Sequence, residues 1–379
     1  MFEKKRTFLI LCLIFFTVLL FSNTVIARMD IEDTDERRAE NYYRGEVISV
    51  EERQQEDDYF REGIEQQAKI KITSGPYEDK VVNIDNLYVE DRQHLNIYLE
   101  EGMSVILVAF ERDGGVEFHL QDVARDHGLL FLLILFVILL LVVGWIKGLK
   151  TLITLVFTGV VIAKFMLPLL LQGYSPIPVT IFSSLLIIVF ILIGIGGFNF
   201  KSLAAIIGTG VGVFVAGILA FYVGEISYLT GFSSNEAQML LTGDFTIDIR
   251  GLLFAGIIIG SLGAITDVAM SVASSAAEIK KANPEMGIFQ LINAAFNVGR
   301  DIMGTMANTL ILAYVGGSLH LLLLLMRTET DWLRIINMDL IATEVVRGLA
   351  GSIGLIVSIP VTALVAAFLL EKVSSDQMS

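Results

Sequence analysis

The sequence predicts an α-helical polytopic membrane protein with a small extracytoplasmic β-rich N-terminal domain, for which an OB-like barrel is one candidate shape. Hydrophobic residues make up 54% of the 379 positions and charged residues only 18%, a composition too apolar for a soluble chain of this length. The formal net charge of −14 is concentrated in residues 28–127, which hold 26 acidic and 12 basic side chains, so the remainder is neutral. This asymmetry predicts an acidic exposed domain followed by an electrically balanced membrane domain.

Four consecutive parts are expected along the chain. A basic start and a long apolar run make residues 1–27 a signal peptide or a signal anchor, two alternatives that the sequence leaves open. Residues 28–127 form the acidic extracytoplasmic β domain, residues 128–373 the membrane bundle, and residues 374–379 a cytoplasmic tail. In the β domain, apolar Ala68, Ile70 and Ile72 alternate with polar neighbours, which is the period of a half-buried strand.

Seven apolar segments follow the β domain, each long enough to cross about 30 Å of hydrocarbon. They are residues 129–146, 151–171, 179–198, 202–223, 251–273, 302–326 and 346–370. Lysine placement orients them, because cytoplasmic loops are enriched in basic residues. With the β domain outside, the loops on the cytoplasmic side receive Lys147, Lys150, Lys201, Lys280, Lys281 and Lys372. We therefore expect a multi-pass protein of the cell membrane whose C-terminus is cytoplasmic.

Ionisable residues inside these apolar segments are the candidates for function, because a charge at membrane depth is costly without a partner or a role. Asp267 begins a stripe at helical spacing with Ser271, Ser274, Ser275 and Glu278, and Asp301 begins a second with Thr305 and Asn308. The remaining candidates are Lys164, Arg300, Glu344 and Arg347. We expect Asp267 and Asp301 to face one polar interior, as coupled groups that coordinate a cation or carry protons.

The alternatives to transport are structural. Polar groups in a bundle often hydrogen-bond one helix to another, for about a kcal/mol or less each. The same residues then belong to a non-enzymatic membrane scaffold or partner subunit, whose extracytoplasmic domain recognises another protein. Residues 274–299 are too polar for a span, and either an interfacial helix or a re-entrant hairpin accounts for them.

Enzyme and cofactor signatures are missing from the sequence. It contains no P-loop and no dinucleotide-binding glycine motif, and its single cysteine, Cys12, excludes an intramolecular disulfide and a cysteine-based metal site. We therefore predict no enzymatic activity, no cofactor and no bound metal. The acidic domain disfavours nucleic acid. The expected associates are the lipid bilayer, a small solute or ion, and a paralogous membrane partner or a second copy of the chain.

Three runs carry a resemblance to a known family. The runs DVAMS from Asp267, GRDIMGTMANTLILAY from Gly299 and ATEVVRGLAGSIG from Ala342 resemble the YibE/F-like family of bacterial multipass membrane proteins. The resemblance extends from about Tyr42 to the C-terminus. It implies an integral membrane protein without an established biochemical activity. Because the family name joins two related proteins, the resemblance also suggests that a paralogous partner is worth seeking.

Overall fold

The computed structural model describes residues 41–57, 60–89, 97–112, 115–240, 247–327 and 331–371. The chain divides into two compact units, one of residues 33–139 and one that comprises mainly residues 140–379. The predicted N-terminal signal, residues 1–27, and the predicted tail, residues 374–379, lie outside the described residues.

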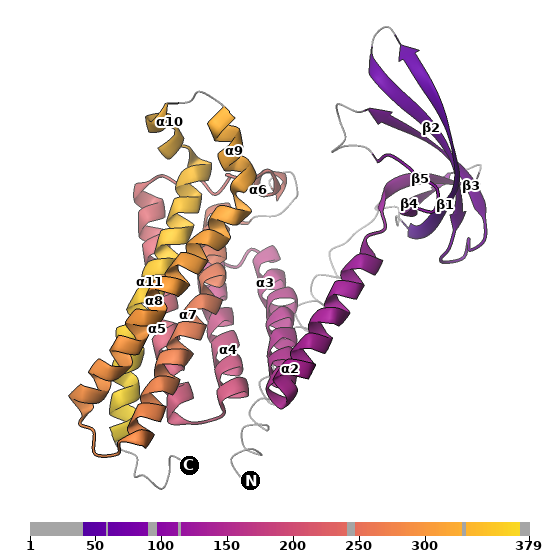
Figure 1. The fold of residues 1–379 in the computed structure, drawn as a ribbon. Helices are drawn as coiled ribbons and strands as arrows, with labels where there is room; N and C mark the ends of the chain where they lie inside the picture. The colour runs from indigo at the N-terminus through magenta and orange to yellow at the C-terminus, as the bar shows by residue number, and fades with distance from the viewer. Residues whose placement is uncertain are drawn as a thin grey trace. The chain divides into compact units, whose positions relative to one another are not determined.

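The first unit contains an antiparallel sheet that curls into a half-barrel (Figure 1). Its strands are β1 (Asn41–Asp57), β2 (Phe60–Ile72), β3 (Val81–Val89), β4 (Ser104–Arg112) and β5 (Gly115–Val123), in the order β3-β2-β1-β4-β5. The edge strands β3 and β5 contact one another without pairing, as in a partly open five-stranded barrel. The structure thus confirms the predicted β-rich domain.

The concave side of the half-barrel holds the apolar core that alternation predicts. Ala68, Ile70 and Ile72 are buried and pack with Val47 and Leu107. One polar residue, Gln66, lies fully buried among them. Its amide nitrogen donates to the carbonyl oxygen of Leu99 at 3.1 Å and its amide oxygen accepts from the Leu99 N–H at 2.9 Å, so its burial is compensated.

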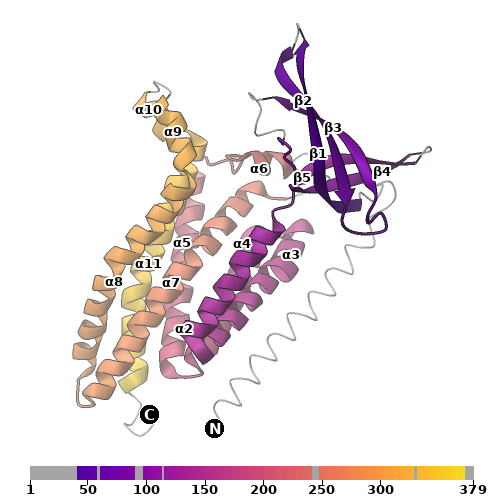
Figure 2. The same ribbon diagram turned by 45° about the vertical axis from the view of Figure 1, so that its right-hand side comes forward.

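The second unit is a bundle of long helices, of which the first, α2, begins within the first unit. In chain order the helical elements are α2 (Asp126–Val160), the π-helical turn η2 (Val161–Met166), α3 (Leu167–Leu171), α4 (Pro176–Gly196), α5 (Phe200–Ile226), α6 (Asn235–Met239), α7 (Ile249–Ala282), α8 (Ile288–Gly317), α9 (Leu319–Arg327), α10 (Trp332–Ile336) and α11 (Asp339–Glu371). Helices α5, α7, α8 and α11 lie side by side in both views (Figures 1 and 2).

The described helices supply five segments long and apolar enough to cross a membrane, or six if the bent pair α8–α9, with its 61° angle, is one span. The sequence predicts seven, and the difference lies in the first segment, Asp126–Leu171, which has 46 residues. That length is about 69 Å of helix, enough for two crossings. Trp145 interrupts it with φ 47° and ψ −128°, one residue before the end of the predicted span 129–146. The structure therefore confirms a polytopic membrane protein.

The segment 274–299 is a helix–connection–helix hairpin, and whether it is interfacial or re-entrant stays a prediction. Its first part is the end of α7, which runs without a break to Ala282, and its last part is the beginning of α8, which starts at Ile288. A short connection, residues 283–287, joins the two helices into a hairpin. Lys280 closes this connection by donating hydrogen bonds to the carbonyl oxygens of Pro284 and Met286 at 2.7 and 2.9 Å.

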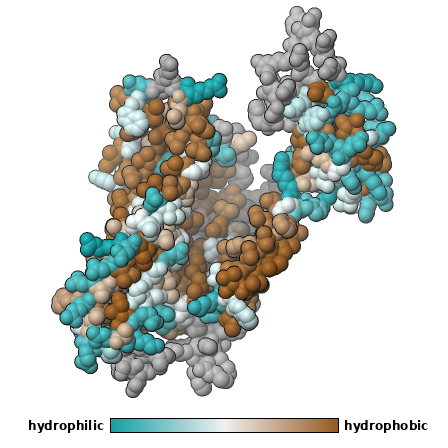
Figure 3. Space-filling model, viewed as in Figure 1, coloured by the Kyte–Doolittle hydropathy of each residue, from teal (hydrophilic) through white to brown (hydrophobic). Residues whose placement is uncertain are grey.

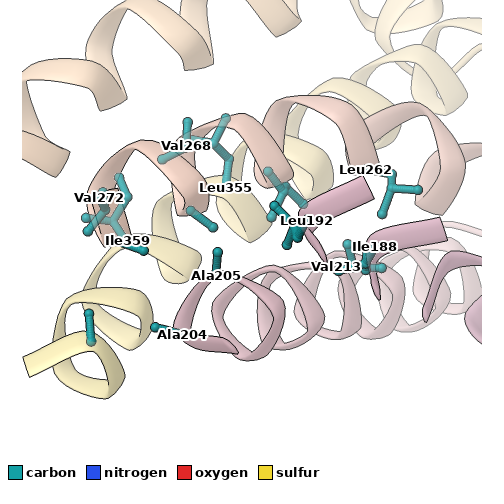
Figure 4. Close-up of a cluster of buried hydrophobic side chains, with 14 of the residues drawn as sticks. Ile188, Leu192, Ala204, Ala205, Val213, Leu262, Val268, Val272, Leu355 and Ile359 are labelled. Carbon is teal, nitrogen blue, oxygen red and sulfur yellow. The ribbon is translucent and has the colours of Figure 1, made fainter. Parts of the chain in front are cut away.

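The core of the bundle is built by close helix packing. Side chains from α4, α5, α7 and α11, among them Ile188, Val213, Val268 and Leu355, converge on one buried cluster (Figure 4). Small residues let the backbones approach. A Cβ on Gly212 of α5 would lie only 2.7 Å from the carbonyl oxygen of Gly354 on α11. The crossing of α5 and α11 therefore requires glycine on both helices.

Candidate functional site

Helix α7 places its predicted polar stripe on the outside of the bundle. Asp267, Ser271 and Glu278 are exposed, and Ser274 and Ser275 are half-buried beside them. The opposite side of the helix, which carries Ile265, Val268 and Val272, is buried in the core. The 3.6-residue period separates the two sides, because positions three or four apart share one face of a helix.

Helix α8 shows the same division. Its packed side carries Leu291, Ala295 and Gly299, which are buried against the bundle. Its exposed side carries Arg300, Asp301, Gly304, Thr305 and Asn308. The surface view shows the result, because pale and teal atoms interrupt the brown surface over the lower parts of α7 and α8 (Figure 3). We call this surface the outward α7–α8 face; it comprises Gly256, Gly263, Asp267, Ser271, Arg300, Asp301, Gly304, Thr305 and Asn308.

The charged groups of the two helices lie at a similar depth. Asp267 stands 15 residues before the end of α7 at Ala282, and Asp301 stands 13 residues after the start of α8 at Ile288. Along antiparallel neighbours this corresponds to about 22 and about 20 Å from the connection. The packing agrees, because a Cβ on Gly299 would lie 3.1 Å from Cγ2 of Val272.

The prediction that Asp267 and Asp301 face a shared polar interior is wrong. Both are exposed, and in the described part of the bundle the buried polar side chains are serines and threonines, with no carboxylate among them. The reason is steric. Alanine and glycine on α5 and α11 bring these helices close to the apolar side of α7, which leaves the carboxylates only the outer surface.

The charged side chains on the outward α7–α8 face form no ion pair with the described residues of the chain. Asp267, Arg300 and Asp301 make no ion pair with any described residue, whereas the Arg300 guanidinium lies 5.7 Å from the ring centroid of Phe296. Lys164 is also exposed and without an ion pair to a described residue; it lies on η2, which packs against α4. The structure thus does not bring Lys164 into an ion pair with the carboxylates.

Glu344 and Arg347 form a separate polar group on α11. Arg347 Nη1 donates to Glu344 Oε1 at 2.7 Å, and the side chains are 30% and 22% exposed, respectively. Glu344 also lines a largely apolar cavity of about 270 Å³ between α8, α9 and α11. Residues three apart share one face of a helix, which brings these two side chains within pairing distance.

Tyr314 is a residue that the sequence analysis does not single out. It lines the same cavity as Glu344, and its hydroxyl oxygen is buried without a hydrogen-bond partner among the described residues. A Cβ on Gly260 of α7 would lie 2.7 Å from that oxygen. The only sequence signal is that Tyr314 is a polar-tipped side chain within the apolar run of α8.

The arrangement as a whole offers charge but no preformed cage. Among the described residues, no three His, Cys, Asp or Glu side chains are grouped as metal ligands, and the predicted lack of a metal stays a prediction. The outward α7–α8 face instead presents two carboxylates, one guanidinium and several hydroxyl or amide groups along two adjacent helices. Such groups stabilise a polar neighbour or a hydrated path and are unfavourable against lipid.

Comparison with known proteins identifies one family. The model of the YibE/F-like protein family matches residues 132–372, a range that contains the bundle and the whole outward α7–α8 face. No curated protein and no solved structure matches the chain.

Proposed function

The chain belongs to the YibE/F-like family, and we propose that it is one subunit of a membrane transport protein for a small ion or solute. The pathway in this proposal runs along the outward α7–α8 face and is completed by another subunit. The observation that carries the proposal is the position of Asp267, Arg300 and Asp301 on the exposed side of two adjacent helices at a similar depth.

Energetics favour a pathway at this surface. A charged side chain at the centre of the bilayer costs on the order of 3 kcal/mol by insertion scales. Three such groups facing lipid would therefore be strongly unfavourable, whereas the same groups beside a hydrated path keep their solvation. The face carries two carboxylates and one guanidinium, so its net charge favours a cation or a protonated solute over an anion.

Each polar group has a role in this proposal. Asp267 and Asp301 coordinate the ion or carry its proton, and Ser271, Thr305 and Asn308 supply neutral oxygens along the path. Arg300 limits how tightly the carboxylates hold the cation, because a nearby positive charge weakens cation binding. The extracytoplasmic position of the β domain, the cytoplasmic C-terminus and residence in the cell membrane belong to the same proposal and rest on the lysine distribution.

The test is uptake by the full-length chain reconstituted in liposomes. A panel of H⁺, Na⁺, K⁺ and Mg²⁺ gradients, each with its own fluorescent indicator, should show a flux above that of protein-free vesicles. Asp267→Asn and Asp301→Asn should each reduce that flux at least tenfold, while Glu285→Gln, which removes a carboxylate in the exposed connection, should leave it unchanged. Undiminished flux in both Asn variants, or no flux of any ion, would contradict the proposal.

A second candidate is a membrane scaffold whose β domain recognises another protein. One observation favours it: β3 and β5 are edge strands with no ladder partner on their outer sides among the described strands. An open edge can accept an extended peptide as an additional strand. Retained partner binding together with zero flux in the liposome assay would favour this candidate over transport.

A further inference from the structure

The outward α7–α8 face contains glycines that the fold of the single chain does not explain. A Cβ added to Gly256, Gly263 or Gly304 would meet nothing within 4 Å. On α5 and α11, by contrast, a Cβ on Gly208, Gly212 or Gly354 would collide with the neighbouring helix. Glycine within a helix costs roughly 0.8–1 kcal/mol relative to alanine, and close packing of a helix from outside the chain would offset that cost.

The charged residues on this face indicate what kind of protein surface would pack against it. Asp267, Arg300 and Asp301 lie at a similar depth along the helices. Two copies of a membrane protein insert in the same orientation, so the axis that relates them in a twofold dimer is parallel to the membrane normal. Rotation about such an axis keeps every residue at its depth. The guanidinium of one copy and the carboxylates of the other therefore lie at a similar depth.

We propose that a second copy of this chain covers the outward α7–α8 face. Arg300 of each copy pairs with Asp267 or Asp301 of the other, and the open glycines allow the two α7–α8 hairpins to approach closely. This inference rests on the proposed function, because it names the subunit that completes the pathway. The pathway then lies on the twofold axis and is lined by both copies.

The charge balance of such a dimer supports a cation as the transported species. Each copy contributes two negative groups and one positive group at this depth. After both Arg300 side chains pair, one carboxylate per copy stays uncompensated beside the axis. Two uncompensated carboxylates close together in a low dielectric favour a bound cation or a shared proton.

Cross-linking in intact membranes tests the dimer without any transport measurement. The background is Cys12→Ser, which removes the only cysteine. In that background, Gly304→Cys on two differently tagged copies should give a cross-linked product of twice the chain mass that carries both tags. The matched control is Ile218→Cys, which places a thiol on the exposed apolar side of α5 and should give at least tenfold less product.

Charge variants test the pairing itself. In the Gly304→Cys background, Arg300→Asp makes the face uniformly acidic and should reduce the dimer product at least tenfold, whereas Arg300→Lys should retain most of it. Equal cross-linking at positions 304 and 218, an adduct that contains only one tag, or an undiminished product in Arg300→Asp would each overturn the proposal. A dimer without ion flux would instead refute transport and leave this interface standing.

Discussion

Two helix surfaces in this bundle carry the same small-residue signature and have opposite surroundings. On α5 and α11, Gly212 and Gly354 face one another so closely that neither position has room for a Cβ. On the outward α7–α8 face, Gly263 and Gly304 meet nothing. The difference teaches that small residues in a membrane helix indicate close packing of two helices. The structure of a single chain shows which of these helix pairs pack within that chain.

The ionisable residues follow the same division. On α11, Arg347 and Glu344 pair within the chain at 2.7 Å, so their charges are compensated locally. On the outward α7–α8 face, Asp267, Arg300 and Asp301 have no ion-pair partner among the described residues. These open glycines and unpaired charges are the observations on which the proposed interface rests.

The largest effect is expected at the packed surface. Gly354→Val would place a Cβ 2.5 Å from the carbonyl oxygen of Gly212 and 2.8 Å from the Cβ of Ala216, so α5 and α11 must separate. We expect a loss of stability of about 3 kcal/mol or more, measured as the melting temperature of the detergent-solubilised protein. Gly304→Val, with the same change in volume on the open face, is the control. A similar loss of stability in Gly354→Val and Gly304→Val would contradict the difference in packing between the two surfaces.

A large favourable effect on membrane insertion is expected when the charge of Asp301 on α8 is removed. Asp301→Leu should make insertion of the α8 segment more favourable by up to about 3 kcal/mol, because aspartate is among the least favourable residues on insertion scales and leucine among the most favourable. Glycosylation mapping of the segment in a reporter protein measures this change. Thr305→Leu on the same face should produce a smaller gain. Unchanged insertion in Asp301→Leu would indicate that Asp301 lies outside the hydrocarbon.

A moderate effect is expected where charges are paired within the chain. Arg347→Ala leaves the half-buried Glu344 carboxylate beside an apolar cavity without its partner. We expect a loss of about 1–2 kcal/mol, reduced from the value for a fully buried pair because both side chains retain some exposure. Adding Glu344→Gln should restore part of the stability, since it removes the stranded charge. A double variant less stable than Arg347→Ala would contradict the pairing as the cause.

The smallest effect is expected for Gly304→Ala. The added methyl group meets nothing within the chain, and alanine favours the helix. The monomeric protein in detergent should therefore keep its free energy of unfolding or gain at most about 1 kcal/mol. The measurement is its melting temperature, which should stay equal or rise. With Asn308→Cys as the cross-linking site in the Cys12→Ser chain, Gly304→Ala should nevertheless weaken cross-linking between copies, because the methyl group holds the two helices apart. A clear loss of monomer stability would show that the open face is covered by the chain itself.

Much of the architecture is predictable from residue patterns. Period-two alternation locates β2 through Ala68, Ile70 and Ile72, which the structure shows buried. Apolar length locates the spans, and helical spacing places Asp267, Ser271 and Glu278 on a single side of α7. The number of crossings is harder to predict, because the break at Trp145 and the 61° bend after α8 depend on local backbone geometry.

What the sequence by itself determined is which residues share a face; what only the tertiary structure decided is where that face points. Spacing assembles Asp301, Thr305 and Asn308 on one side of a helix because the helical period is a property of the backbone. In a membrane, apolar side chains suit both the lipid and the core, so hydropathy does not distinguish the inner side from the outer. The close contact of α5 and α11 at Gly212 and Gly354 fills the centre of the bundle, and that packing directs the carboxylates outward.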